Sequence, residues 1–147
     1  MEDHTVIDVL KDLLAAEQQS LAPRLFESTM FVSRLDAGAY EVVCSSAQAS
    51  REHCGALTEL ILDLGGQPAP RLADSSTANL HYLELHHALP RLVVDQQSLE
   101  RKYANAAPRV AGEPRASDLV NHILERRRQD LVRLQSSAAR PEPALRA

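Results

Sequence analysis

Four long segments of this chain repeat apolar residues every three or four positions, the spacing that places them along one side of an α-helix. We expect the helices at about residues 5–35, 39–64, 78–107 and 117–134. A helix with one apolar side is stable only when that side packs against other elements. The pattern therefore predicts an all-α protein built as a four-helix bundle.

The connections between these segments indicate the topology of the bundle. Residues 36–38 (DAG) form a short turn, which brings the second helix back antiparallel to the first. Residues 65–77 form a long connection that starts with two glycines and shows no apolar period. This order predicts a long crossover between the second and third helices, with a plain up-down bundle as the alternative. Pro23 and Pro90 are expected to kink their helices, and Ser117 is the expected N-cap of the last one.

Length and composition limit the domain organisation and the partners. The chain has 147 residues, of which 3% are aromatic, and its formal net charge is −4. We expect one helical domain over residues 1–134, followed by a disordered, Pro- and Ala-rich tail at 135–147. The mild charge gives no reason to expect a nucleic-acid partner. In the short basic run at 126–128, we expect two solvated arginines and one buried arginine.

The cysteines and the apolar runs indicate the compartment. Cys44 and Cys54 fall on one expected helix, where ten residues place them ~15 Å apart, too far for a disulfide. They are expected to be reduced thiols, as in the cytoplasm. The N-terminal segment is acidic and amphipathic, unlike a signal peptide, and no apolar run reaches the ~18 residues that a membrane span needs.

Polar residues occupy several positions on the apolar sides of the predicted helices (their inner seams), where leucine would be expected. These positions come from all four helices and are Glu17, Ser50, His53, Asp95, Arg127 and Asp130. Burying a carboxylate costs several kcal/mol unless a cation or hydrogen-bond donors compensate it. Five ionisable residues on four seams therefore predict one shared polar core. The alternatives are a purely structural network of ion pairs and seam positions that face solvent.

Two stretches and one spacing carry a resemblance to a known family. Residues 51–68 (REHCGALTELILDLGGQP) place a histidine before apolar turns and a Gly-x-Pro stop, and residues 123–131 (ILERRRQDL) form the second stretch. The spacing is that of Glu17, which precedes Ser50 by 33 residues. Over residues 6–134 the chain resembles the bacterioferritin and rubrerythrin branch of the ferritin-like superfamily. In that family a Glu from each of two helices and a Glu-x-x-His from each of the other two hold two irons.

The resemblance implies a damaged di-iron site. Glu17 and His53 match retained ligands, and Asp95 matches a ligand shortened by one methylene. At the remaining positions Ser50 and Arg127 replace the two bridging glutamates of the family, and Asp130 replaces a histidine.

Arg127 would bring a fixed positive charge into this site. We expect its guanidinium to occupy the metal space and to pair with Glu17, Asp95 or Asp130. This hypothesis makes the protein a structural or interaction module, without catalytic residues or a cofactor.

The competing hypothesis is an altered metal site in an iron-handling protein or oxidase. Glu17, His53, Asp95 and Asp130 would then bind iron, manganese or zinc. Enzymatic activity would need this site to work, so the balance is against an enzyme. Haem is not expected, because Arg51 stands where the family's haem-ligating methionine would be.

Two weaker expectations concern the surface. His81, Glu84 and His87 recur every three residues and form a candidate surface metal site, with a solvated helical face as the simpler explanation. We also expect a homo-oligomer, a dimer or larger, without a membrane partner. This rests on apolar residues away from the inner seams, which are Phe31, Val32, Val42 and Leu60.

Overall fold

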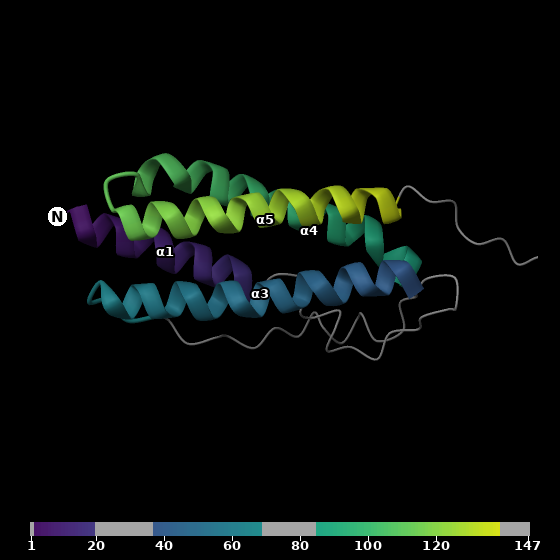
Figure 1. Ribbon diagram of the computed structural model, residues 1–147, viewed down its shortest axis with the longest axis horizontal. Helices are drawn as coiled ribbons and strands as arrows, with labels where there is room; N and C mark the ends of the chain where they lie inside the picture. Colours follow the sequence, from purple (N-terminus) through teal and green to yellow (C-terminus); the bar gives the residue numbers. More distant parts are fainter. Residues whose placement is uncertain (1, 20–36, 69–84, 139–147) are drawn as a thin grey trace, which may run out of the picture.

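The computed structural model describes residues 2–19, 37–68 and 85–138, which form four long helices packed lengthwise (Figure 1). The helices are α1 (Glu2–Gln18), α3 (Ala37–Asp63), α4 (Leu85–Ala106) and α5 (Pro114–Ala138), with a short 3-10 helix η3 (Ala107–Val110) between the last two. The predicted all-α four-helix bundle is therefore confirmed. None of these described helices is long and apolar enough to cross a membrane.

The direction of the helices confirms the predicted crossover. Figure 1 shows α3 and α4 running the same way along the bundle, with α1 and α5 running the opposite way. Helix α1 packs on α3, α4 packs on α5, and α5 also packs on α3, so each of these pairs is antiparallel. The consecutive helices α3 and α4 therefore run in parallel, with the end of α3 and the start of α4 at opposite ends of the bundle. A plain up-down topology is thereby excluded.

The end of α3 follows directly from two glycines. Gly65 has a φ of +89°, a left-handed conformation that favours glycine. The Gly66 N–H donates to the Ile61 carbonyl at 2.8 Å, and the Gly65 N–H donates to the Leu62 carbonyl at 3.0 Å. These two bonds satisfy carbonyls that the helix end would otherwise leave unpaired. The predicted stop at Gly65-Gly66 is confirmed.

The start of α5 differs from the prediction. The helix begins at Pro114, three residues before the expected N-cap Ser117. Proline suits the first helical position, where its missing N–H costs no hydrogen bond. The first helical bond runs from the Ser117 N–H to the Glu113 carbonyl at 2.9 Å, so Glu113 takes the cap position.

Other predicted boundaries are tested only in part. Helix α5 continues to Ala138, so the first four residues of the predicted tail are helical, and residues 139–147 lie outside the described chain. The second half of the first predicted helix, with Pro23, also lies outside it. Helix α4 contains Pro90 and continues through it.

The apolar core fills the end of the bundle where α1 and α5 begin. Its fully buried members, from all four helices, include Leu10, Leu14, Leu57, Ile61, Tyr103, Val120 and Ile123. Leu60 is buried in this core, so its expected place away from the inner seam was wrong, whereas Val42 is half-buried. Phe31 and Val32 lie outside the described residues. One turn beyond Leu14 the core becomes polar at Glu17.

Candidate functional site: a buried arginine at the centre of the bundle

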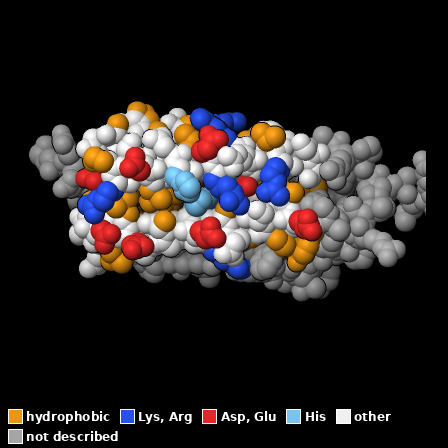
Figure 2. Space-filling model, in the orientation of Figure 1, with side chains coloured by type: hydrophobic (Ala, Val, Ile, Leu, Met, Phe, Trp, Pro, Cys, Tyr) orange, Lys and Arg blue, Asp and Glu red, His pale blue; other side chains and the backbone are white. Residues whose placement is uncertain are grey.

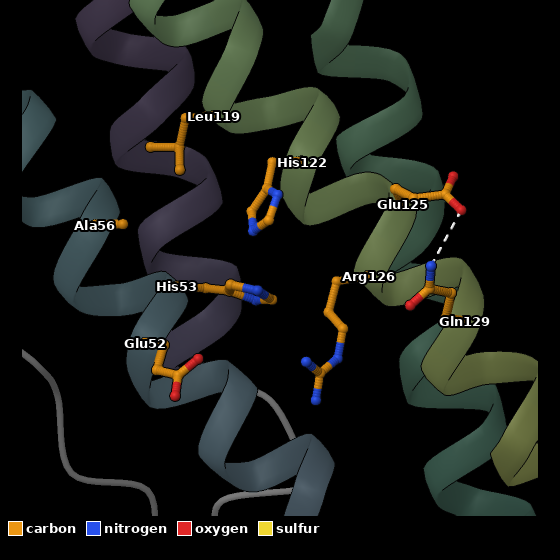
Figure 3. A pocket seen from close by; sticks show the side chains of 8 residues that line it. All are labelled: Glu52, His53, Ala56, Leu119, His122, Glu125, Arg126 and Gln129. Atoms are coloured by element: carbon orange, nitrogen blue, oxygen red, sulfur yellow. Dashed lines mark hydrogen bonds between the residues drawn. The ribbon is translucent and has the colours of Figure 1, made fainter.

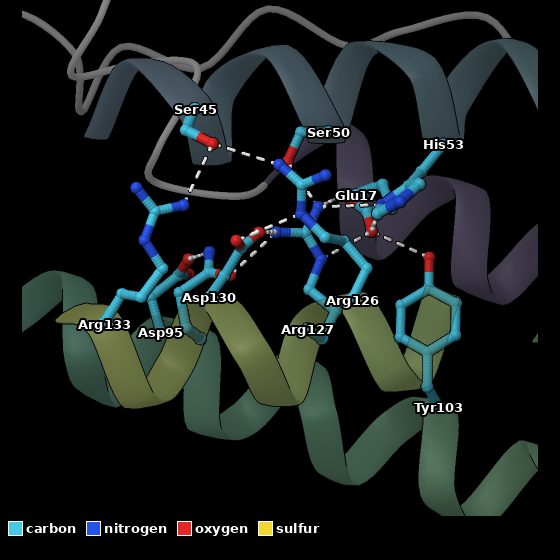
Figure 4. A network of polar contacts seen from close by, with 11 residues as sticks. Glu17, Ser45, Ser50, His53, Asp95, Tyr103, Arg126, Arg127, Asp130 and Arg133 are labelled. Atoms are coloured by element: carbon cyan, nitrogen blue, oxygen red, sulfur yellow. Dashed lines mark hydrogen bonds and ion pairs between the residues drawn. The ribbon is translucent and has the colours of Figure 1, made fainter. Parts of the chain in front are cut away.

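Arg127 lies in the middle of the bundle with no exposed surface (Figure 4). Its Nε donates to Glu17 Oε1 at 3.2 Å and its Nη2 donates to Glu17 Oε2 at 3.0 Å. This two-pronged contact joins α5 to α1 and matches the planar guanidinium to the planar carboxylate. The structure thus has the ion pair that was expected between Arg127 and Glu17.

The remaining edges of the guanidinium reach the other two helices. Arg127 Nη1 donates to Gln96 Oε1 on α4 at 2.9 Å, and Nη2 donates to Ser50 Oγ on α3 at 2.8 Å. Nη2 also lies 3.0 Å from His53 Nδ1. One side chain of α5 therefore contacts all three other helices.

The contacts of His53 depend on where its ring proton lies. Arg127 Nη2 has two hydrogens but three acceptors within 3.0 Å, which are Glu17 Oε2, Ser50 Oγ and His53 Nδ1. His53 Nδ1 also lies 3.4 Å from Glu17 Oε1. When Nδ1 accepts from Arg127, the proton of the neutral ring is on Nε2. When Nδ1 carries a proton, it donates toward Glu17 instead.

Glu17 is held in its charged form. Burial raises the pKa of this carboxyl, but the hydrogen bond with His53, the positive charge of Arg127 and the Tyr103 hydroxyl together bring it below its ordinary value. The Tyr103 hydroxyl donates to Glu17 Oε1 at 2.8 Å. Burial and the Glu17 charge raise the pKa of Tyr103 well above its ordinary value, which keeps it a neutral donor.

Asp130 lies beside the central ion pair without completing it. Its Oδ1 accepts from Arg126 Nε at 3.1 Å, and Arg126 Nη2 donates to Ser45 Oγ at 3.0 Å. Asp130 Oδ2 is 3.8 Å from Arg127 Nη1, too long for a hydrogen bond, and finds no hydrogen-bond partner among the described residues. The carboxylate is thus buried between two arginines and bound directly to one of them.

Two members of this cluster were missed in the sequence. Gln96 is fully buried against Arg127, whereas the expected residue, Asp95, is half-buried and accepts from Gln96 Nε2 at 3.3 Å. Both residues lie between the seam positions Leu92 and Leu99, so spacing alone allows either. The other missed member is Tyr103, which was not among the candidate site residues, although a buried tyrosine hydroxyl usually needs a partner.

The residues present do not fit a di-metal centre. Within residues 2–19, 37–68 and 85–138, no group of three or more His, Cys, Asp or Glu side chains is arranged to hold a metal ion. Figure 4 shows the Arg127 guanidinium between Glu17 and Asp130, two of the candidate metal-binding carboxylates. Of the candidate surface site, His81 and Glu84 lie outside the described residues, as does the side chain of His87.

The basic run on α5 has the one expected buried arginine, but only one of its other two arginines is exposed. Arg127 is buried and Arg126 is half-buried, whereas Arg128 is exposed and pairs with Glu100 at 3.1 Å. This neighbour offers a natural control for Arg127, because both arginines form ion pairs at similar distances in opposite surroundings.

Comparisons with known proteins identify the fold. No protein-family model matches the chain, and no curated protein matches its sequence. The structure is similar to the crystal structure of antigen TpF1 from Treponema pallidum, with a TM-score of 0.76 and 15% sequence identity. The similarity covers 95% of this chain and 94% of that chain. The two proteins thus share a fold over nearly their whole length.

Proposed function

We propose that this chain is a ferritin-like protein of the bacterioferritin and rubrerythrin type, in which an ion-pair core replaces the di-iron centre. It acts as a structural or interaction module without catalysis. The observation that carries the proposal is the buried Arg127 guanidinium, bonded to Glu17 at the depth where the family holds its metals. The parallel course of α3 and α4, which the long crossover produces, supports the ferritin-like assignment.

Electrostatics explains why this core disfavours a metal. Two unit charges 4 Å apart interact by about 4 kcal/mol at the effective dielectric constant of a protein site, so a divalent ion next to Arg127 meets about 8 kcal/mol of repulsion. The same guanidinium already neutralises Glu17, the carboxylate that would otherwise attract the ion. A metal would therefore have to displace Arg127 from at least four hydrogen bonds.

The test is the response to ferrous iron in air. For the natural chain we expect less than one equivalent of bound iron and oxidation no faster than in buffer. The double variant Ser50→Glu/Arg127→Glu restores two glutamates and removes the fixed cation, so it should bind at least one equivalent. A matched control, Gln48→Glu/Arg128→Glu, makes the same change in charge at exposed positions on the same two helices and should bind no more than the natural chain.

Two outcomes would contradict the proposal. Stoichiometric iron in the natural chain, with oxidation faster than in buffer, would favour the iron-handling or oxidase function instead. Equal iron binding by the double variant and by its control would mean that Ser50 and Arg127 do not stand at former ligand positions. Metal content is measured after gel filtration, and oxidation is followed by absorbance.

A cytoplasmic homo-oligomer is the remaining part of the proposal. Large apolar side chains are exposed on three of the described helices, among them Leu62, Val94 and Val132. Burying such residues between copies of the chain would favour assembly. Light scattering after gel filtration should give a dimer or larger, and a monomer at all accessible concentrations would refute this part.

A further inference from the structure

A cavity of about 400 Å³ opens between α3 and α5, next to the central ion pair (Figure 3). Its lining is apolar at one end and polar at the other, and comprises Glu52, His53, Ala56, Leu119, His122, Glu125, Arg126 and Gln129. On the outer face, Figure 2 shows a histidine side chain between hydrophobic and basic side chains. This volume lies within the range of cavities that hold small organic ligands.

Three nitrogen-bearing side chains are directed into this cavity. The His53 side chain is only 7% exposed, and its Nδ1 is engaged by Arg127 and Glu17, which leaves Nε2 for the cavity. Arg126 uses its Nε and Nη2 in other hydrogen bonds, and its Nη1 forms none with the part of the chain that the structure describes. The exposed His122 ring forms no hydrogen bond with the described part of the chain and points toward the same space in Figure 3.

We propose that this cavity binds a small organic acid as a monoanion. Arg126 and His122 hold its carboxylate, together with His53 Nε2, and its apolar part lies against Ala56 and Leu119. When His53 Nδ1 accepts from Arg127, the proton of the neutral ring is on Nε2, which can then donate to the ligand. An arginine N–H also donates to carboxylates, in a charge-assisted hydrogen bond.

The lining favours this ligand class over two others. A metal ion would have to bind beside the positive charge of Arg126, and the described residues contain no group of three metal-binding side chains arranged for it. A dianion such as phosphate would be repelled more strongly than a monoanion by the rim carboxylates Glu52 and Glu125. Neither argument depends on the lost iron chemistry, so this site stands or falls separately from the proposed function.

The test uses benzoate as the probe and the full chain with isotope-labelled histidines. At constant ionic strength, the ring signals of His53 and His122 should shift and saturate with a Kd of about 1–10 mM. Benzamide has the same ring without the charge and should bind at least about tenfold more weakly, because it cannot form the charged pair with Arg126. His122→Ala should weaken benzoate binding by about fivefold or more and leave the fold intact, because His122 is exposed.

Arg126→Gln is expected to weaken benzoate binding by about tenfold, and the matched control Arg128→Gln should leave it unchanged. Thermal unfolding of each variant shows whether it is folded, and His122→Ala keeps the test decisive if Arg126→Gln is not. Three results would overturn the proposal. The first is the absence of saturable shifts up to about 50 mM benzoate. The second is that benzamide binds as tightly as benzoate. The third is that inorganic phosphate, or one equivalent of Zn²⁺, binds more tightly than benzoate and that His122→Ala abolishes this binding.

Discussion

Replacing Arg127 with methionine removes the central positive charge and keeps most of the side-chain volume. Four hydrogen bonds of the guanidinium are lost, two of them to Glu17. The Glu17 carboxylate would stay buried with the Tyr103 hydroxyl and His53 as its remaining partners. Removing one partner of a buried ion pair costs about 3–5 kcal/mol, because the other charge is left uncompensated.

A loss of this size is large compared with the stability of an ordinary domain, which is about 5–15 kcal/mol. For a chain of this length each kcal/mol lowers Tm by about 2–4 °C, so Arg127→Met should lower Tm by about 6–20 °C. The exposed neighbour provides the control. Arg128→Met removes an ion pair of 3.1 Å whose arginine side chain is 54% exposed, and should cost less than about 1 kcal/mol.

Urea denaturation followed by circular dichroism measures both free energies of unfolding. A double-mutant cycle with Glu17→Gln then isolates the pair, and we expect a coupling energy of about 2–3 kcal/mol. The reasoning is refuted if Arg127→Met and Arg128→Met cost the same, or if the cycle gives a coupling energy near zero. Either result would mean that Arg127 does not compensate Glu17 in solution.

Three further predictions follow from the same structure. Tyr103→Phe removes a donor to buried Glu17 and should cost about 1.5–3 kcal/mol in urea denaturation, and no loss would contradict this hydrogen bond. The pKa of the Glu17 carboxyl is lower in the folded chain than in the unfolded chain, where it is about 4.3. The contribution of Glu17 to the free energy of unfolding is therefore complete above pH ~4.3 and is lost as pH falls through the folded pKa. Glu17→Gln should flatten the acid side of a profile of stability against pH. A Cβ at Gly66 would lie 2.6 Å from Ile7 Cγ2, so Gly66→Ala should lower Tm. A Cβ at Gly55 would meet nothing within 4 Å, so Gly55→Ala should raise the free energy of unfolding by about 0.5–1 kcal/mol.

The helices were predictable because burial of an apolar stripe decides them, and the stripe is visible in the sequence. The end of α3 was predictable because Gly65 can adopt the left-handed conformation at little cost. The start of α5 was not, because Pro114 and Ser117 are both good start signals within one turn. Which of the two residues starts α5 depends on the position and direction in which η3 leads the chain into the helix, and no local sequence pattern encodes this.

The sequence indicated several of the residues in the central cluster, but not all of their hydrogen-bond partners. Glu17 and Arg127 stand out because charged residues interrupt apolar seams, and the structure has them paired. Gln96 was missed because a helix turns by about 100° per residue, so a small rotation of α4 decides whether Gln96 or Asp95 faces the centre. That rotation is set by packing against the other helices, and a single sequence does not reveal it.

The central positive charge, the Arg127 guanidinium, is part of the chain, and this changes how the stability of the fold depends on solution conditions. In a bundle whose core charge is balanced by a bound ion, the free energy of unfolding rises with the concentration of that ion, and a chelator lowers it. Arg127 is carried by α5 itself, so its charge arrives with the helix during folding and cannot dissociate from the folded core. On the proposed function, we therefore expect the stability of this core not to change with metal concentration, and to depend on pH through Glu17.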